Sequence, residues 1–298
     1  MRILVTGGSG FVGRNVVEHF GRKHEVLAPT HKELDLLDEN KVGDFFRQNE
    51  IDAVIHTAIK PGNRNTKEAS NRFYSNVRMF FNIMRNSDRF GKMILTSSGA
   101  IYDMRYPIME ASEDFVGERI PADDLGFSKY IISKHIDHMP NVTELRIFGV
   151  FGKHEDYEIR FISNAICRAL LGLPITIKQN RIFSYVYISD LMKVMEHFIK
   201  KDGEYKSYNV TDGLPMELLA IAKKVSEITG RNADINIKYE GMKIEYSGNN
   251  SRLVKETGIG FMKIGDAIKD LVEWYEENIG RIDRDLLLMD EKNRWEQI

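Results

Sequence analysis

Tyr130 and Lys134 are the side chains in this sequence best suited to move a proton. They stand four positions apart in a helix-like segment, so the phenol and the ammonium share one helix face. A free tyrosine titrates near pH ~10, too high for acid–base catalysis at neutral pH, and a fixed cation nearby lowers that pKa. The spacing predicts a tyrosine that exchanges a proton with a substrate oxygen. A surface pair without function is the alternative for this motif taken alone.

A glycine-rich turn near the N-terminus predicts a phosphate-binding site. Residues 6–13 read TGGSGFVG, follow the apolar residues 3–5 and open a helix-like segment. Gly7 permits a tight turn, Gly10 lets a pyrophosphate approach the backbone, and Gly13 lets the helix pack closely. We interpret the turn as dinucleotide-binding, and a structural turn without ligand is the alternative. The candidate contacts are Gly7, Ser9, Gly10, Phe11, Val12 and Gly13.

Hydroxyl side chains follow the fourth predicted strand, at residues 93–95. The carboxyl ends of parallel strands form the edge at which ligands bind. We therefore expect Ser98 to hydrogen-bond a carbonyl or alcohol oxygen of a substrate. A polar turn at the strand end is the alternative.

The end of the second predicted strand indicates which dinucleotide the chain prefers. NAD enzymes usually place a carboxylate there to bind the ribose 2′-hydroxyl. Residues 28–32 read APTHK, which offers no acid but includes His31 and Lys32. Arg14 follows the glycine turn and is the third candidate for a 2′-phosphate. We therefore expect NADP(H), while Glu33 and Asp35 lie close enough to keep NAD(H) possible. Solvated surface charges are the alternative for the three basic residues.

Alternating strand and helix patterns position these groups in the first half of the chain. Strands are predicted at 3–5, 26–28, 53–55, 93–95 and 143–148, with helices at 11–20, after Asp38, at 68–88 and at 127–138. Strands separated by helices predict a parallel sheet with right-handed crossovers. Residues 99–126 show neither helical nor strand periodicity, and we expect this long loop to close over a substrate.

The pattern changes after Gly152. Short strands at 175–177, 184–188 and 235–239 mix with helices near 189–200, 216–229, 250–257 and 265–279. The predicted fold class is α/β, a Rossmann-type doubly wound parallel sheet with a smaller mixed α/β cap. Residues 1–152 form the dinucleotide-binding domain. Residues 153–298 form mainly the substrate-binding cap, with some segments returning to the core.

Composition excludes several classes of function. The 298 residues carry 42 basic and 44 acidic side chains, a net charge of −2, so we expect no nucleic-acid or membrane partner. Cys167 is the only cysteine, which excludes an intramolecular disulfide and a cysteine zinc cluster. The histidines show no metal-ligand spacing, so we assign no metal. The N-terminus leaves no room for a signal peptide, and we expect a cytoplasmic protein.

Together the motifs resemble the extended short-chain dehydrogenase/reductase family of nucleotide-sugar epimerases, dehydratases and reductases. Residues 6–13 resemble its TGxxGxxG, Tyr130, Ser133 and Lys134 its YxxSK, and residues 97–102 its SSxxVY. The similarity extends to residues 146–148 and to the YVYISDL sequence at 185–191. Further similarities lie at Asp35 and Leu36, at Thr57 and Ala58, and at Asn76, which the resemblance implies as cofactor contacts.

The resemblance implies a role for each central residue. Tyr130 would be the acid–base catalyst, and Lys134 would hold the nicotinamide ribose and lower the Tyr130 pKa. Ser98 would orient the reacting oxygen, with Gly99 and Tyr102 beside the substrate. Two cap arginines, Arg181 and Arg252, are candidates for the substrate diphosphate, with ordinary surface arginines as the alternative. The helices near 68–88 and 127–139 would pair two subunits in a homodimer.

Departures from the family pattern narrow the expected reaction. The dehydratases place an Asp-Glu pair where this chain has Gly99 and Ala100. GDP-fucose synthases, which residues 32–38 and 51–54 resemble, epimerise with a cysteine and a histidine. Those positions correspond to Ala100 and, approximately, Arg160. The family often has an asparagine after its fifth strand, where this chain has Gly149, which implies a different pocket floor.

We therefore expect an NADPH-dependent reduction of the 4-keto group of a nucleotide-linked deoxysugar. A nucleotide-sugar 4-epimerase with tightly bound NAD is the alternative. A reductase of a small carbonyl without a nucleotide, and a non-catalytic NADP-binding protein, are further alternatives.

Overall fold

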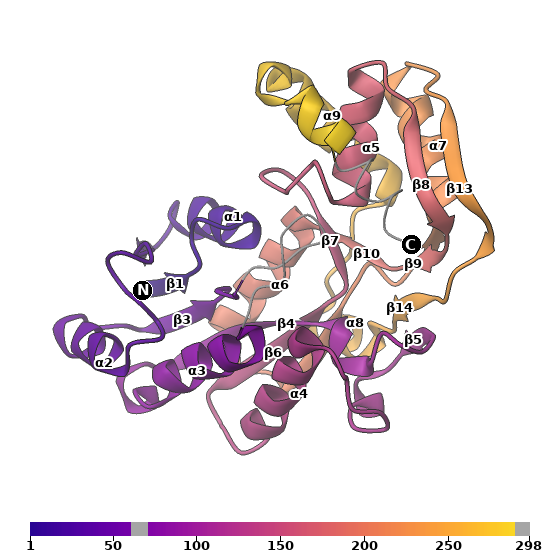
Figure 1. Cartoon of the computed structure of the whole chain (residues 1–298). Coiled ribbons are helices and arrows are strands. Elements are labelled where there is room, and N and C mark those ends of the chain that lie inside the picture. Colours follow the sequence, from indigo (N-terminus) through magenta and orange to yellow (C-terminus); the bar gives the residue numbers. More distant parts are fainter. Residues whose placement is uncertain (61–70, 290–298) are drawn as a thin grey trace.

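A six-stranded parallel sheet forms the centre of the protein. The computed structural model describes residues 1–60 and 71–289. The strand order is β11-β6-β4-β3-β1-β2, and every neighbouring pair is parallel. These strands are β1 (Arg2–Thr6), β2 (Glu25–Leu27), β3 (Ala53–His56), β4 (Lys92–Ser98), β6 (Val142–Ile147) and β11 (Ser207–Val210). The first-half sheet predicted from the alternating pattern is thus present (Figure 1).

Helices cover both faces of this sheet. One face packs against α1 (Phe11–Phe20) and α6 (Ile188–Lys200), and the other against α2 (Glu39–Gln48), α3 (Arg72–Met84) and α4 (Asp124–Ile136). The helix expected at 68–88 falls partly outside the described residues. Asp38 caps α2, because its carboxylate accepts hydrogen bonds from the backbone of Asn40 and Lys41.

The C-terminal cap is built from three helices and short strands. The helices α5 (Phe161–Leu170), α7 (Leu218–Thr229) and α9 (Ile264–Glu277) pack together, with β8 (Ile175–Asn180) paired to β13 (Ile235–Met242). A second small sheet has the order β12-β9-β14-β5. Its strands are β12 (Met216–Glu217), β9 (Ile182–Phe183), β14 (Tyr246–Gly248) and β5 (Ile108–Ala111).

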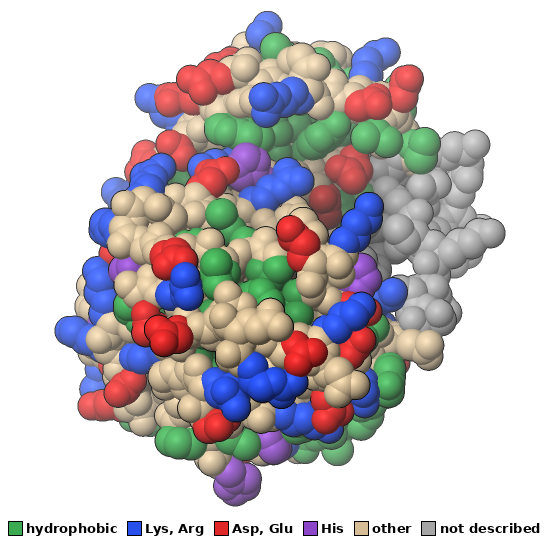
Figure 2. All heavy atoms as spheres, turned by 90° about the vertical axis from the view of Figure 1, so that its left-hand side faces the viewer, with side chains coloured by type: hydrophobic (Ala, Val, Ile, Leu, Met, Phe, Trp, Pro, Cys, Tyr) green, Lys and Arg blue, Asp and Glu red, His purple; other side chains and the backbone are tan. Residues whose placement is uncertain are grey.

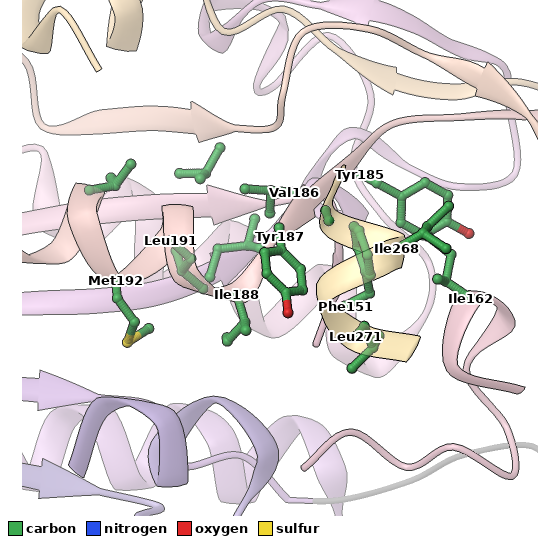
Figure 3. Packing of buried hydrophobic residues seen from close by; sticks show 14 of the residues in the cluster. Phe151, Ile162, Tyr185, Val186, Tyr187, Ile188, Leu191, Met192, Ile268 and Leu271 are labelled. Atoms are coloured by element: carbon green, nitrogen blue, oxygen red, sulfur yellow. The ribbon is translucent and has the colours of Figure 1, made fainter. Parts of the chain in front are cut away.

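The cap and the sheet share one hydrophobic core. Strands β7 (Gly149–Phe151) and β10 (Tyr185–Tyr187) pair side by side where the chain leaves the sheet. Figure 3 shows Phe151 and Tyr187 beside Ile268 and Leu271 of α9, with Leu191 of α6 close by. Because this core is continuous, the cap is held rigidly against the edge of the sheet.

Two short strands differ from the sequence expectation. Residues 99–126, expected as a loop without secondary structure, contain β5, which pairs with β14 of the cap. The sixth strand of the sheet, β11, comes from residues beyond 152 and pairs with β6, and α8 (Ser251–Thr257) packs against it. Short strands escape sequence analysis because their pairing partners are distant in the chain.

No helix in the described ranges is both long and apolar enough to cross a lipid bilayer. Figure 2 shows the side of the molecule that lies on the left of Figure 1. There the basic and acidic side chains are interspersed, and neither sign forms a continuous patch.

Candidate functional site

The glycine turn joins β1 to α1 in a conformation that requires glycine. Gly7 has φ +73°, and a Cβ on it would lie 2.8 Å from the backbone of Ala58. A Cβ on Gly13 would lie 2.1 Å from the carbonyl oxygen of Gly7, so only glycine lets the helix begin this close to the turn. The Gly10 amide donates to that same carbonyl at 3.0 Å.

The start of α1 fits a pyrophosphate. Gly10 is the N-cap and supplies no side-chain cap, so the first-turn amides of the helix have no side chain to satisfy them. A Cβ on Gly10 would meet only the Gly7 carbonyl, at 3.4 Å, which leaves open space beside the turn. Unsatisfied amides at the positive end of a helix are a general anion-binding arrangement. The predicted contacts Gly7, Ser9, Gly10, Phe11, Val12 and Gly13 all lie in this turn or in the first turn of α1.

Basic side chains lie exposed near the end of β2. Arg14 is exposed and its Nε donates to the Ser9 carbonyl at 2.8 Å, which holds it beside the glycine turn. His31 is 79% exposed and lies 3.7 Å from Asp35. Lys32 is also exposed.

The two acids near β2 are engaged by their own segment. Glu33 accepts from the amide and the hydroxyl of Thr30, at 2.7 and 2.9 Å, and these hydrogen bonds lower the pKa of the Glu33 carboxyl. Asp35 accepts from the Leu37 amide at 3.0 Å, with Leu36 buried beside it. These hydrogen bonds engage one oxygen of each carboxylate, Oε2 of Glu33 and Oδ1 of Asp35.

The remaining expected cofactor contacts lie at the edge between β1 and β3. The Thr57 hydroxyl donates to the Thr6 carbonyl at 2.7 Å, and Ala58 packs on Gly7. Asn76 is buried in α3, where its side-chain oxygen accepts from the Lys60 amide at 2.7 Å. The Asn76 side chain therefore ties Lys60 to α3.

Tyr130 and Lys134 share one space on α4. The Lys134 Nζ lies 5.9 Å from the centroid of the Tyr130 ring. A Cβ on Gly117 would lie 3.7 Å from that Nζ and 4.0 Å from the Tyr130 hydroxyl oxygen, so both groups converge beside Gly117. Gly117 has φ +101°, a conformation that favours glycine and brings residues 113–117 close to the pair.

Ser98 ends β4 next to α4. Its Oγ accepts a hydrogen bond from the Ala100 amide at 3.2 Å. The N-terminus of α4 packs on the same turn, since a Cβ on Gly126 would lie 2.7 Å from the Ala100 carbonyl. The structure thus brings the strand end that carries Ser98 against the helix that carries Tyr130 and Lys134.

Tyr102 lies inside the protein. Its hydroxyl donates to the Asn209 side-chain oxygen at 2.6 Å, and burial raises its pKa to about 12. Nearby, Glu144 of β6 accepts from Ser133, Ser207 and Arg146 at 2.8 to 2.9 Å. The Tyr102 hydroxyl is therefore occupied by a protein group, whereas Gly99 lies at the strand end beside Ser98.

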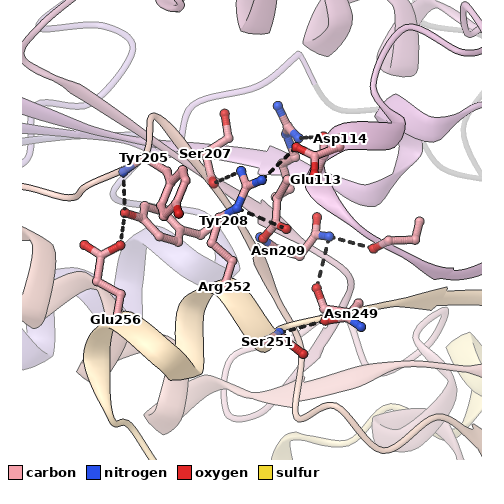
Figure 4. Close-up of polar contacts among 12 residues, drawn as sticks. Glu113, Asp114, Tyr205, Ser207, Tyr208, Asn209, Asn249, Ser251, Arg252 and Glu256 are labelled. Atoms are coloured by element: carbon pink, nitrogen blue, oxygen red, sulfur yellow. Dashed lines mark hydrogen bonds and ion pairs between the residues drawn. The ribbon is translucent and has the colours of Figure 1, made fainter.

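Arg252 is paired with acids of the segment that covers Lys134. Figure 4 shows its guanidinium between Ser207, Asp114 and Glu113; it donates to Asp114 at 2.8 Å and lies 3.6 Å from Glu113. A polar cavity of about 390 Å³ is lined by Lys134 as well as Arg252. Arg252 thus holds residues 113–114 near the site, and its charge is already compensated.

Arg181 has no acidic partner in the described part of the chain. Its guanidinium carbon lies 5.1 Å from the centroid of the Phe183 ring, and its buried Nε has no hydrogen-bond acceptor among the described groups. Burial lowers the pKa of Arg181. An uncompensated arginine of this kind is suited to an anion. Phe183 also explains Gly149, since a Cβ there would lie 2.5 Å from its ring.

Two buried residues near the site were missed by sequence analysis. Tyr246 of β14 is 5% exposed, and its hydroxyl oxygen would lie 2.5 Å from a Cβ on Gly99. Lys129 precedes Tyr130, is 6% exposed, and donates from Nζ to the Thr96 carbonyl at 2.8 Å. No sequence signal marks Tyr246. Lys129 could have been found from the sequence, because its spacing places it on the apolar face of α4 with Ile132 and Ile136.

Within residues 1–60 and 71–289, no three His, Cys, Asp or Glu side chains are placed to bind one metal ion together.

Comparison with known proteins gives one family and a consistent fold. The model of the NAD dependent epimerase/dehydratase family matches residues 3–211. Among curated relatives, the UDP-glucose 4-epimerase of Bacillus subtilis is 25% identical over 288 residues, covering 78% of this chain and 83% of its own.

Two solved structures confirm the predicted α/β fold. The UDP-glucose 4-epimerase of Thermotoga maritima, solved with UDP-glucose, has a TM-score of 0.79 at 19% identity and covers 94% of this chain and 100% of its own. The GDP-mannoheptose C4 reductase of Campylobacter jejuni, with NADP bound, has a TM-score of 0.77 at 18% identity, covering 92% and 98%.

Proposed function

Because this chain belongs to the NAD-dependent epimerase/dehydratase family, we propose that it reduces the 4-keto group of a nucleotide-linked deoxysugar with NADPH. Family members are NAD(P)-dependent enzymes of the oxidoreductase type, acting on nucleotide sugars. The observation that carries the proposal is the convergence of Tyr130 and Lys134 beside Gly117, on a helix packed against the strand end that carries Ser98.

The proposed chemistry needs one proton from the protein. When bound, NADPH would supply the hydride that reduces C4 of the sugar. Tyr130 gives its phenolic proton to the C4 oxygen as negative charge develops there, and Lys134 stabilises the resulting phenolate. Ser98 donates a hydrogen bond to the same oxygen and fixes its direction.

The proposed preference for NADPH rests on the surroundings of β2. Arg14, His31 and Lys32 offer three basic side chains to a 2′-phosphate. The residues that directly follow β2 include no acid, and one oxygen each of Glu33 and Asp35 is already engaged by Thr30 and Leu37. A net reductase oxidises NADPH to NADP+ and releases it in each turnover, so a preference for NADPH fits this reaction.

The proposed nucleotide-sugar site includes Arg181. Its uncompensated charge and its buried Nε favour a diphosphate at this position. Arg252 is better explained as a clamp on residues 113–114 than as a direct diphosphate contact, because Asp114 and Glu113 already balance its charge.

A nucleotide-sugar 4-epimerase is the second candidate. The similarity to two UDP-glucose 4-epimerases favours it, and Tyr130 and Ser98 serve either reaction. The candidates differ in cofactor handling, because an epimerase returns the hydride and retains its NAD.

The proposed assembly is a homodimer through α3 and α4, which pack side by side on the same sheet face (Figure 1). Light scattering behind a size-exclusion column measures this mass directly.

The decisive experiment measures NADPH and NADH oxidation against dTDP-, CDP-, UDP- and GDP-linked 4-keto-6-deoxyhexoses. We expect turnover of one nucleotide series with NADPH, and a loss of at least about 100-fold in kcat for Tyr130→Phe. Tyr239→Phe, which removes an exposed phenol on β13 of the cap, is the matched control. Oxidation of no panel member, together with NAD retained in the purified protein, would establish the epimerase instead.

A further inference from the structure

Arg146 of β6 is a buried arginine that lies among the segments carrying the candidate catalytic groups. Its side chain is 5% exposed, and its Nε donates to Oε2 of Glu144 at 2.9 Å. Glu144 is fully buried on the same strand, so the two charges compensate each other away from water. A buried ion pair adds little net stability compared with apolar residues of the same volume. Stability is therefore a weak explanation of this pair, and the other donors of Arg146 indicate a further role.

One of these donors holds α4. Nη2 of Arg146 donates to the Ser133 Oγ at 3.0 Å, and the Ser133 hydroxyl in turn donates to Oε2 of Glu144 at 2.8 Å. Ser133 is a buried residue of α4 and lies between Tyr130 and Lys134 in the chain. Both partners of its hydroxyl are thus on β6. The helical turn that carries the candidate catalytic pair is therefore bound to the ion pair.

The other terminal nitrogen of the guanidinium reaches two further segments. Nη1 of Arg146 donates to the Glu113 carbonyl at 2.9 Å and to the Tyr102 hydroxyl at 3.4 Å. Glu113 lies four residues before Gly117, where the chain passes beside the candidate catalytic pair. Tyr102 ends the short 3-10 turn that directly follows Ser98. One guanidinium group therefore contacts α4, the segment leading to Gly117 and the turn after Ser98.

We propose that Arg146 is a positioning residue that fixes Ser98 relative to Tyr130 and Lys134 by holding their segments on one rigid group. The guanidinium is planar and its donors are fixed relative to one another, so the three segments cannot shift independently. Proton transfer requires hydrogen-bond reach to the substrate oxygen, and a displacement of about 1 Å costs on the order of 100-fold in rate. The inference rests on the proposed function, since it concerns the oxygen that Tyr130 and Ser98 share.

A purely structural role for Arg146 leads to a different expectation. In that case Arg146 matters only because it neutralises Glu144, and removing both charges together would restore stability and activity alike. A positioning role separates the two properties. Removing both charges restores stability, but kcat stays low because the connection among Ser133, Glu113 and Tyr102 is lost.

The catalytic test compares Arg146→Met with the double variant Glu144→Gln/Arg146→Met. The single variant leaves a buried carboxylate uncompensated, so we expect its urea midpoint to fall, and the double variant to regain most of that loss. We expect kcat of the double variant to remain at least about tenfold below the wild type, with NADPH affinity within about threefold. A double variant with the kcat of the wild type overturns the proposal.

Ser133→Ala is the milder variant, because it removes only the hydroxyl that joins α4 to Arg146. We expect its kcat to fall at least about threefold. The matched control is Ser163→Ala, which removes a buried serine hydroxyl that donates to the buried Glu155 in the cap. The control should lose stability and keep the kcat of the wild type. Equal kcat values for the two serine variants would contradict the positioning role.

Hydrogen exchange without substrate or cofactor separates this inference from the proposed function. The amides of residues 103, 115, 116 and 118 donate to backbone carbonyls of their own segments, so their exchange reports local opening. We expect exchange of residues 99–103 and 113–118 to be at least about fivefold faster in the double variant, with α9 unchanged. An unchanged or uniformly faster pattern overturns the proposal. If the wild type turns over no panel member, the proposed function fails, and the exchange pattern alone decides whether Arg146 fixes these segments.

Discussion

Replacing Lys129 by methionine is expected to stabilise the protein at neutral pH. Lys129 lies on the buried face of α4, where its Nζ donates to the Thr96 carbonyl, and no carboxylate in the described residues forms an ion pair with it. Burial lowers the Lys129 pKa to about 8 from 10.5, and the charge of Glu144 only partly opposes this. Methionine has a similar length and carries no charge, so it removes the desolvation penalty and keeps most of the packing.

The magnitude follows from the difference between the two pKa values. A change from 10.5 to about 8 corresponds to roughly 3 kcal/mol. The folded state binds fewer protons than the unfolded state between pH 8 and 10.5, so the unfolding free energy of the wild type rises with pH across this window. The lost hydrogen bond to Thr96 offsets about 1 kcal/mol. The net gain for Lys129→Met at pH 7 is therefore about 2 kcal/mol.

The assay is urea unfolding of wild type and Lys129→Met at pH 7, 8, 9 and 10. We expect the difference in unfolding free energy to favour the variant at pH 7 and to fall by roughly 3 kcal/mol toward pH 10.5. Lys223→Met, on the exposed face of α7, is the control and should change stability by less than about 0.5 kcal/mol at every pH.

Two results would refute this reasoning. A variant that is less stable than the wild type at pH 7 would mean that the buried charge is compensated by partners stronger than Thr96 and Glu144. A difference that does not vary between pH 7 and 10 would mean that Lys129 titrates as an exposed lysine does.

Further predictions concern the glycine turn, the cap and the diphosphate. Gly13→Ala should weaken NADPH binding at least tenfold in a fluorescence titration, because its Cβ would lie 2.1 Å from the Gly7 carbonyl; Gly265→Ala, which meets nothing within 4 Å, should bind normally. Burial raises the Glu155 pKa to about 8 from 4.5, so the folded state binds more protons than the unfolded state between these pH values. The unfolding free energy of the wild type should therefore fall as the pH rises from 4.5 to 8, and the urea midpoints of Glu155→Gln should not show this fall. Parallel midpoint curves would contradict this. Arg181→Met should raise KM for the nucleotide sugar at least tenfold with kcat within about threefold, and an unchanged KM would exclude a diphosphate contact.

Local sequence signals determined the parts of the site that lie close together in the chain. The glycine turn requires a positive φ at Gly7 and no Cβ at Gly13, and both requirements concern residues within one turn and one helix. The four-residue spacing of Tyr130 and Lys134 is likewise a local property of α4. Such features can be predicted because helix and turn geometry translate spacing directly into position.

Contacts between distant segments could not be predicted in this way. Tyr246 reaches Gly99 only because β14 pairs with β5 and β9, and neither short strand has a recognisable period. Arg252 was expected at the substrate, but the fold places Asp114 and Glu113 against it. Lys129 departs from the rule that lysines stay exposed, and its environment depends on residues of three strands, His56 of β3, Thr96 of β4 and Glu144 of β6.

The pairing of β5 with β14 also determines the order in which the parts of a newly synthesised chain can fold. Once residue 211 has left the ribosome, all six strands of the parallel sheet are available, together with the glycine turn, Ser98 and Tyr130. Residues 108–111 must still wait for residues 246–248, more than 130 positions later, before their strand has a partner. A nascent chain can therefore assemble its parallel sheet first, whereas the surroundings of Ser98 are completed only after residue 248 has emerged.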